Sequence, residues 1–273
     1  MKRLLRDPRF WICGLIISVV VLLAVFAPLL TTHIFDEMNP SYRLKGPGNG
    51  YLLGTDEFGR DIWTRMIYGA RLTLLISFGS IMVSLSAGTL LGMNAGYRGK
   101  MVEMVTMSVI DFVMSFPPIL VAMFIIVFIG SSVQNLILTI GIVFIPTFAR
   151  VARSATLAIK QNEYVEAARA MGATDGRILR RTIIPNIWGL IIVQISLSLG
   201  NAMLLESSLS FLGLGPPPYI PSWGRSIADA TRFMHINAHA VIWPSVILTL
   251  TILAFSILGD TIHDGFDPRL KSR

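Results

Sequence analysis

Six long stretches of the chain contain almost no charged residues. They cover residues 10–30, 72–97, 104–130, 133–149, 186–205 and 241–259, and within them only Asp111 carries a charge. A helix needs about 20 apolar residues to cross the hydrocarbon core of a bilayer. The pattern therefore predicts an all-α, multi-pass membrane protein with six transmembrane helices. Residues 1–9 precede the first helix, residues 31–71 form a polar segment, and residues 72–273 hold the other five helices.

The composition agrees with this pattern and excludes two other classes of protein. Hydrophobic residues make up 53% of the 273 residues and charged residues only 14%. A soluble domain has about 25% charged residues, and a disordered chain is poor in apolar residues. The single cysteine, Cys13, allows no intrachain disulfide and no cysteine-based metal site.

The positive charges indicate an orientation. Most of the 23 lysines and arginines fall in residues 1–9, 98–103, 150–184 and 261–273, and the rest in 31–71 and 215–240. Because cytoplasmic loops carry the excess of Lys and Arg, both termini are predicted to be cytoplasmic. The stretch 10–30 follows a basic start as in a signal peptide, but it exceeds the 7–15-residue core of such peptides. We interpret it as a retained anchor.

The inner segment 150–185 is too polar to cross a membrane and predicts two short helices. Asn162 can cap a helix over 163–171. Gly172 suits the left-handed position that ends a helix, and a second helix would run from Thr174 or Asp175 to near Pro185. The spacing of Val165, Ala168 and Met171 predicts an apolar stripe. Two interpretations stay open: a solvated basic loop at the lipid headgroups, or a docking surface for a cytoplasmic partner.

The two outer segments are also too polar to cross a membrane. In 31–71, Thr55 or Asp56 could cap a short surface helix that runs toward Arg71. In 206–240, Glu206, Ser207 and Ser210 precede three consecutive prolines, which cannot continue a helix. That segment is either a packed loop or a gate over a pathway. Asp111, inside the third span, is either structural or pathway-lining.

No catalytic constellation is present in the sequence. His235 and His239 lie four residues apart but have no further ligand nearby, so no metal site is predicted. The chain has no phosphate loop of the form GxxxxGK[ST], and therefore no ATP site of that kind. The basic excess is assigned to cytoplasmic loops, and no nucleic-acid partner is expected.

Several motifs together resemble one family of membrane proteins. Glu166, Ala167, Ala168, Gly172, Ile183 and Pro185 resemble the cytoplasmic "EAA" signature of ABC importer permeases, although Ile184 stands where Leu is commoner. A second group resembles the C-type subunit of the oligopeptide/dipeptide/nickel branch. It consists of Gly54, Thr55, Asp56, Gly59, Arg60 and Asp61, then residues 68–71, 208–215, 222–224 and 267–270.

The resemblance implies a function and a set of partners. It implies a type I ABC importer permease in the cytoplasmic (inner) membrane of a bacterium or archaeon, paired with a homologous B-type permease. Two ATPase subunits would bind ATP and Mg, seat the loop 150–185 and drive switching between inward- and outward-open states. An extracytoplasmic binding protein would deliver the substrate. We expect di- or oligopeptides as the substrate, with nickel or a metal chelate as the alternative. A stand-alone channel, a secondary transporter or an intramembrane hydrolase would need a membrane-centred ion or catalytic site, which the sequence does not contain.

Overall fold

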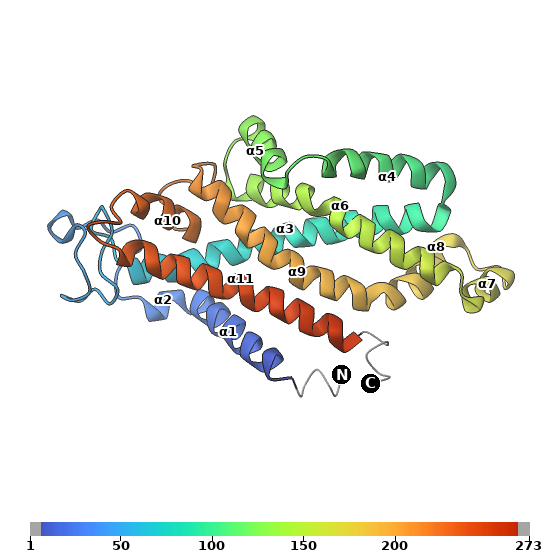
Figure 1. Cartoon of the computed structure of the whole chain (residues 1–273), viewed down its shortest axis with the longest axis horizontal. Helices are drawn as coiled ribbons and strands as arrows, with labels where there is room; N and C mark the ends of the chain where they lie inside the picture. The colour runs from blue at the N-terminus through green and yellow to red at the C-terminus, as the bar shows by residue number, and fades with distance from the viewer. Residues whose placement is uncertain (1–6, 267–273) are drawn as a thin grey trace.

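The computed structural model describes residues 7–266 and is a bundle of long helices (Figure 1). In chain order the helices are α1 Pro8–Val25, α2 Ala27–Leu30, η2 Pro40–Tyr42, α3 Ile62–Arg98, α4 Lys100–Met114, α5 Pro118–Ile129, α6 Val133–Lys160, α7 Glu163–Ala170, α8 Asp175–Ile178, a π-helical turn Leu179–Ile183, α9 Ile184–Phe211, α10 Trp223–Thr231 and α11 His239–Phe266. No β-strand occurs within residues 7–266. The predicted all-α class is confirmed.

Within residues 7–266, five continuous stretches are long and apolar enough to cross a membrane. They are Pro8–Val25, Ile62–Arg98, Val133–Lys160, Asp175–Phe211 and His239–Gly265. The third predicted span, residues 104–130, is divided into α4 and α5, which meet at an angle of 91°. Pro117 and Pro118 explain the break, because proline removes a backbone donor and clashes with the preceding turn. The count is six when this bent pair is taken as one span.

Three predicted helix boundaries are wrong. The second span begins at Ile62 and not at residue 72, so the separate short helix expected between residue 55 and Arg71 does not exist. The fourth span continues to Lys160. The helix expected to end near Pro185 instead runs on into α9, with Pro185 in its first turn, where a missing N–H costs nothing. Charged residues marked the predicted ends, but these helices extend beyond the apolar stretches.

The closest packing in the bundle joins α3 to α6 along a row of glycines. Gly88, Gly92 and Gly96 lie four residues apart on α3 and face the backbone of α6. A Cβ atom at Gly92 would lie 2.1 Å from the carbonyl oxygen of Ala149. Small residues at this spacing allow helix backbones to approach, and this drives association where no hydrophobic effect acts between helices.

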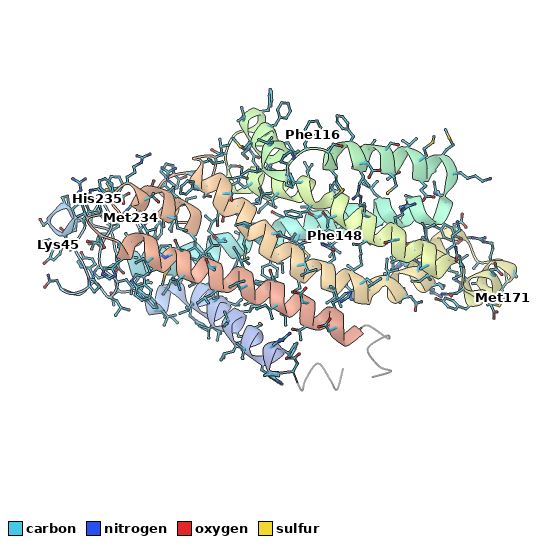
Figure 2. All side chains as sticks on the ribbon, in the orientation of Figure 1. Lys45, Phe116, Phe148, Met171, Met234 and His235 are labelled. Atoms are coloured by element: carbon cyan, nitrogen blue, oxygen red, sulfur yellow. The ribbon has the colours of Figure 1, made fainter. Side chains whose placement is uncertain are left out.

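The two ends of the bundle differ in structure. One end carries α7 and α8, and the other carries α10 and the loops that precede α3 (Figure 1). The start of α1 and the end of α11 both point toward the α7 end (Figure 1). Phe148 is fully buried in the middle, whereas Phe116, between α4 and α5, is exposed (Figure 2).

The glycine row leads to a stability prediction. Gly92→Ala should lower the unfolding temperature of the purified chain in detergent, because the added methyl group meets backbone and not a flexible side chain. Overpacking of this kind costs about 1–3 kcal/mol. Gly14→Ala in α1 is the matched control, since a Cβ there has no atom within 4 Å. Equal unfolding temperatures for the two variants would contradict the assignment.

Candidate functional site

The helix α7, the turn after it and α8 form a capped hairpin, here called the inner hairpin (residues 163–178). Gly172 has φ +82°, the left-handed conformation that the sequence predicts. The Ala173 N–H donates to the Ala168 carbonyl at 3.1 Å and the Gly172 N–H to the Arg169 carbonyl at 2.9 Å. This is the Schellman pattern of helix termination. The turn is therefore fixed by its own backbone.

The apolar stripe predicted on α7, Val165, Ala168 and Met171, is divided between the core and the surface. Val165 is buried against Ile178 and Ile183 in the inner core cluster, and Ala168 is half-buried. The exposed apolar positions are Tyr164, Ala167, Ala170 and Met171. Met171 lies at the tip of this end of the molecule and is 82% exposed (Figure 2). The sequence showed one apolar side of α7 but not which side covers the bundle.

The other residues of the EAA signature, within and just after the inner hairpin, are partly exposed and partly buried. Glu166 and Pro185 are exposed and Ile183 is fully buried. A shallow groove of about 350 Å³ lies beside the turn. It is lined by Ala168, Met171, Ala173, Arg177, Ile178, Arg181 and Thr182. The inner hairpin thus presents a mixed apolar and basic surface.

Tyr97, which the sequence analysis did not single out, joins the hairpin to α3. Its hydroxyl donates to Asp175 Oδ1 at 2.8 Å and accepts from Arg169 Nη2 at 3.1 Å. Tyr97 and Asp175 are 78 positions apart in the chain. No local pattern connects residues at that separation, so only the folded structure could identify the contact.

Glu206 is a fully buried carboxyl near the outer end of α9. Its oxygens accept from Ser210 Oγ at 2.7 Å, Thr73 Oγ1 at 3.1 Å and Ser207 Oγ at 3.3 Å. Thr73 belongs to α3, so this cluster ties α3 to α9. Ser207 also borders a groove of about 340 Å³ between α9, α10 and α11. Glu206 and Ser210 are fully buried and line no open surface.

Asp111, the other candidate for the pathway, lies on the surface of the isolated chain. It accepts from Arg150 Nη2 of α6 at 2.6 Å, and both side chains are more than half exposed. Nearer the start of α4, Glu103 Oε1 accepts from Arg153 Nε at 2.7 Å. Two ion pairs therefore fasten α4 to α6.

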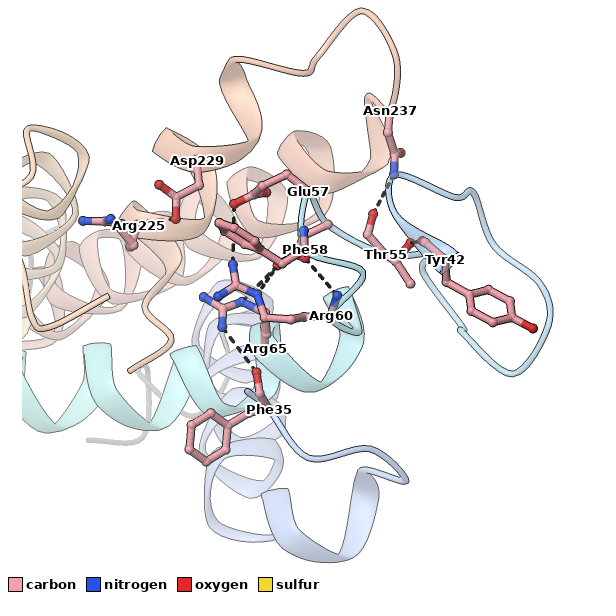
Figure 3. A network of polar contacts seen from close by, with 11 residues as sticks. Phe35, Tyr42, Thr55, Glu57, Phe58, Arg60, Arg65, Arg225, Asp229 and Asn237 are labelled. Carbon is pink, nitrogen blue, oxygen red and sulfur yellow. Dashed lines mark hydrogen bonds and ion pairs between the residues drawn. The ribbon is translucent and has the colours of Figure 1, made fainter. Parts of the chain in front are cut away.

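The predicted outer motif builds a compact structure, here called the outer knot (residues 39–61; Figure 3). Thr55 is fully buried, and its hydroxyl bonds to the Tyr42 carbonyl. The Thr55 carbonyl accepts from Asn237 Nδ2 at 2.9 Å. Gly54 and Gly59 have φ +84° and +74°, and a Cβ on Gly59 would lie 1.9 Å from the Asn39 carbonyl oxygen. These glycines are therefore required by backbone geometry.

Charged residues of the motif are buried in pairs within the outer knot. Asp56 accepts from the backbone N–H of Arg60 at 2.9 Å and from Arg60 Nε at 2.6 Å. Arg65 Nε lies 3.6 Å from the same carboxylate, and its Nη1 donates to the Phe35 carbonyl at 3.3 Å (Figure 3). Burial raises the pKa of the Glu57 carboxyl, and the nearby Asp56 raises it further.

The outer knot ends at Asp61, the residue that caps α3. Asp61 is the N-cap residue of α3, and its Oδ2 accepts from the Thr64 N–H at 3.0 Å and from the Thr64 hydroxyl at 2.5 Å. These contacts satisfy backbone donors that a helix start leaves open. Arg65 lies in the first turn of α3 and is paired with Asp56. This pairing explains why the helix begins before the charge-free stretch.

Residues 222–224, another part of the motif set, hold α10 against the bundle. Trp223 is fully buried and donates from Nε1 to the Met66 carbonyl at 2.8 Å. A Cβ on Gly224 would lie 2.3 Å from the Ser207 carbonyl oxygen. The prolines at 216–218 follow the end of α9, and the outer segment after them contains the helix α10. Residues 267–270, the last part of the motif set, lie outside the described residues.

An outer groove of about 540 Å³ separates the knot from α10. Its lining includes four arginines and two acids: Arg43, Arg60, Arg225, Arg232, Glu57 and Asp229. Within residues 7–266 no group of three or more His, Cys, Asp or Glu side chains could hold a metal ion.

Comparison with known sequences identifies relatives over the whole chain. Residues 88–272 match the family described as "Binding-protein-dependent transport system inner membrane component", and residues 1–47 match the "N-terminal TM domain of oligopeptide transport permease C". The dipeptide transport system permease protein DppC of Alkalihalophilus pseudofirmus is 41% identical over 98% of this chain and 88% of its own length. The glutathione transport system permease protein GsiD of Pectobacterium atrosepticum is 38% identical over 99% of this chain and 90% of its own length.

Solved structures with the same fold are also transport proteins. A chain of the MetNI methionine ABC transporter in an inward-facing conformation superposes with a TM-score of 0.61 at 21% identity, over 74% of this chain and 95% of that chain. A chain of an amino acid ABC transporter gives a TM-score of 0.54 at 17% identity, over 74% of this chain and 94% of that chain. At these identities the likeness concerns the fold alone.

The Glu206 cluster allows a direct test. Glu206→Ala should destabilise the purified chain by on the order of 2 kcal/mol or more, because three buried hydroxyl groups lose their acceptor. Glu206→Gln keeps an oxygen acceptor of the same length and should stay close to the wild type. Unfolding in detergent, followed by circular dichroism, measures both. An alanine variant as stable as the glutamine variant would show that the cluster does not hold α3 and α9 together.

Proposed function

The chain belongs to the family of binding-protein-dependent transport system inner membrane components, and on that premise we propose that it is the C-type permease subunit of an ABC importer for peptides. It would form half of the transport pathway, with a homologous B-type permease forming the other half. Two ATPase subunits would bind ATP and Mg and supply the energy. An extracytoplasmic binding protein would deliver the substrate.

The observation that carries the proposal is the inner hairpin. Its turn is fixed by backbone hydrogen bonds, and its outer face exposes Tyr164, Ala167 and Met171 beside a basic groove. An exposed apolar face on a rigid projection favours a protein partner over water. We therefore assign this face, with Glu166 and Gly172, to the ATPase contact.

The continuous helix after the hairpin supplies a route for movement. The stretch Asp175–Phe211 contains 37 residues, which gives a rod of about 55 Å at 1.5 Å per residue. A push on the hairpin at one end would therefore displace the Glu206 cluster and the start of the outer loop at the other end. This rod connects ATPase closure to the opposite side of the membrane.

The exposed Asp111–Arg150 ion pair supports a position for the pathway. Charged side chains inside transmembrane segments face the bundle interior or a water-filled cavity, because hydrocarbon does not solvate them. Both members of this pair are exposed in the single chain. We assign the face shared by α4 and α6 to the pathway or to the paired permease. We assign the Glu206 cluster a structural role, in which it holds α3 against α9.

The orientation follows from the positive charges and the shared direction of the two termini. The inner hairpin and both termini would be cytoplasmic and the outer knot extracytoplasmic, in the cytoplasmic membrane of a bacterium or archaeon. The outer knot and the groove beside α10 would then face the binding protein.

The test of the proposal is transport by the complete complex in liposomes. The chain is co-expressed with its genomic neighbours for a second permease, the ATPases and a binding protein. We expect ATP-dependent accumulation of labelled di- and tripeptides, and none with the binding protein omitted. Nickel uptake without peptide uptake would show that the substrate is nickel and not a peptide. Transport by this chain alone would contradict the role of a subunit.

Gly172 provides a second test of the coupling role. Gly172→Val should reduce peptide transport at least tenfold in a complex that still assembles, because a β-branched residue at φ +82° costs roughly 1–3 kcal/mol and distorts the turn. Gly176→Ala is the matched control, because Gly176 lies in the same hairpin without a positive φ and has no atom within 4 Å of an added Cβ. Wild-type transport by Gly172→Val would count against the role given to this turn.

A further inference from the structure

Tyr97 is a buried residue in the last turn of α3 on which three other segments converge. Its hydroxyl contacts Arg169 of α7 and Asp175 of α8. Its backbone carbonyl accepts from Lys160 Nζ at the end of α6. The side chain is 4% exposed, although it lies at the polar end of the bundle. One residue thus touches the end of α6 and both helices of the inner hairpin.

The phenol group suits this position because one atom both donates and accepts. It donates to the Asp175 carboxylate and accepts from the Arg169 guanidinium, so it bridges an acid and a base on opposite sides of the turn. The ring adds a second set of contacts: Lys160 Nζ and Arg169 Cζ each lie 5.6 Å from its centroid. Hydrogen bonds to charged groups are stronger than neutral ones.

The covalent connections of the hairpin do not include α3. The hairpin follows α6 through residues 161–162 and continues into α9 through the π-helical turn. The chain gives the end of α3 no direct link to the hairpin, so any force between them passes through noncovalent contacts. Tyr97 supplies the polar contacts between α3 and the two hairpin helices.

We propose that the Tyr97 hydroxyl is a positioning residue that locks the inner hairpin to α3, so that displacement of the hairpin moves the α3–α6 pair together with α9. The inference rests on the proposed coupling of the hairpin to ATPase subunits. Next to Tyr97, Gly96 packs on the Arg153 carbonyl and on Thr156 of α6, so α3 and α6 move as one body. Without the two hydroxyl contacts, the hairpin would be held to the α3–α6 pair only by the short link 161–162 to α6 and by apolar packing, and less of its displacement would reach α3.

The variant Tyr97→Phe removes both hydroxyl contacts and little else. The ring stays in the inner core cluster with Met93, Val165 and Ile178, and both ring–cation contacts remain. In the reconstituted complex we expect normal assembly and basal ATP hydrolysis. The number of peptides transported per ATP hydrolysed should fall about tenfold, because two hydrogen bonds to charged groups are lost. Tyr219→Phe, an exposed tyrosine of the outer segment, is the matched control.

A double-mutant cycle separates positioning from general packing. Asp175→Asn keeps an oxygen acceptor for the Tyr97 hydroxyl and should retain most of the coupling. Asp175→Ala should lose part of it, and the loss in the double variant with Tyr97→Phe should be smaller than the sum of the two single losses, because both changes remove the Tyr97–Asp175 bond and only Tyr97→Phe also removes the Arg169 bond. Independent, additive losses would overturn the proposal, as would a Tyr97→Phe complex with wild-type coupling.

Two outcomes distinguish this inference from the proposed function. A Tyr97→Phe chain that no longer binds the ATPase subunits would give Tyr97 a structural role and overturn the positioning role. The wild-type complex, measured in parallel, reports on the function itself: if it transports no peptide, the proposed substrate fails. The effect of Tyr97→Phe on ATP hydrolysis stimulated by the binding protein then still tests the lock.

Discussion

The close contact between α3 and α6 is the interaction on which the rest of the structure depends. Three glycines at intervals of four residues bring the two backbones together, and the added Cβ distances leave no room for any other residue. Within a bilayer, helix association relies on packing and hydrogen bonds and not on the hydrophobic effect. The α3–α6 pair is therefore the rigid body against which α1, α4 and α9 are placed.

Polar side-chain contacts occur along the whole length of the α3–α6 pair. At one end Asp61 caps α3 and the outer knot buries Arg65 beside Asp56. Further along, Thr73 reaches Glu206 on α9, and the ion pairs of Arg150 and Arg153 fasten α4. At the other end Tyr97 meets the inner hairpin. Because buried polar groups are costly unless paired, the buried hydroxyl groups of Thr73 and Tyr97 fix α9 and the inner hairpin at defined positions against α3.

This arrangement explains how a subunit without chemistry of its own can take part in an energy-driven process. The inner hairpin is rigid by virtue of its Schellman turn, and the helix that follows it reaches the opposite end of the bundle. The α4–α5 pair, bent by 91°, presents an exposed face. In the proposed function, the hairpin would receive the movement of the ATPase subunits, the helix would carry it, and this exposed face would lie toward the pathway or the paired permease.

The sequence by itself determined the features that depend on local chemistry. Absent charges marked the apolar spans and Gly172 marked the left-handed turn, because each acts through neighbouring residues. The tertiary structure alone decided which face of α7 is exposed, that α3 starts at Ile62, and that Asp111 lies on the surface while Glu206 is buried. These outcomes depend on partners distant in the chain, such as Thr73 for Glu206 and Asp175 for Tyr97, and no local pattern encodes such pairs.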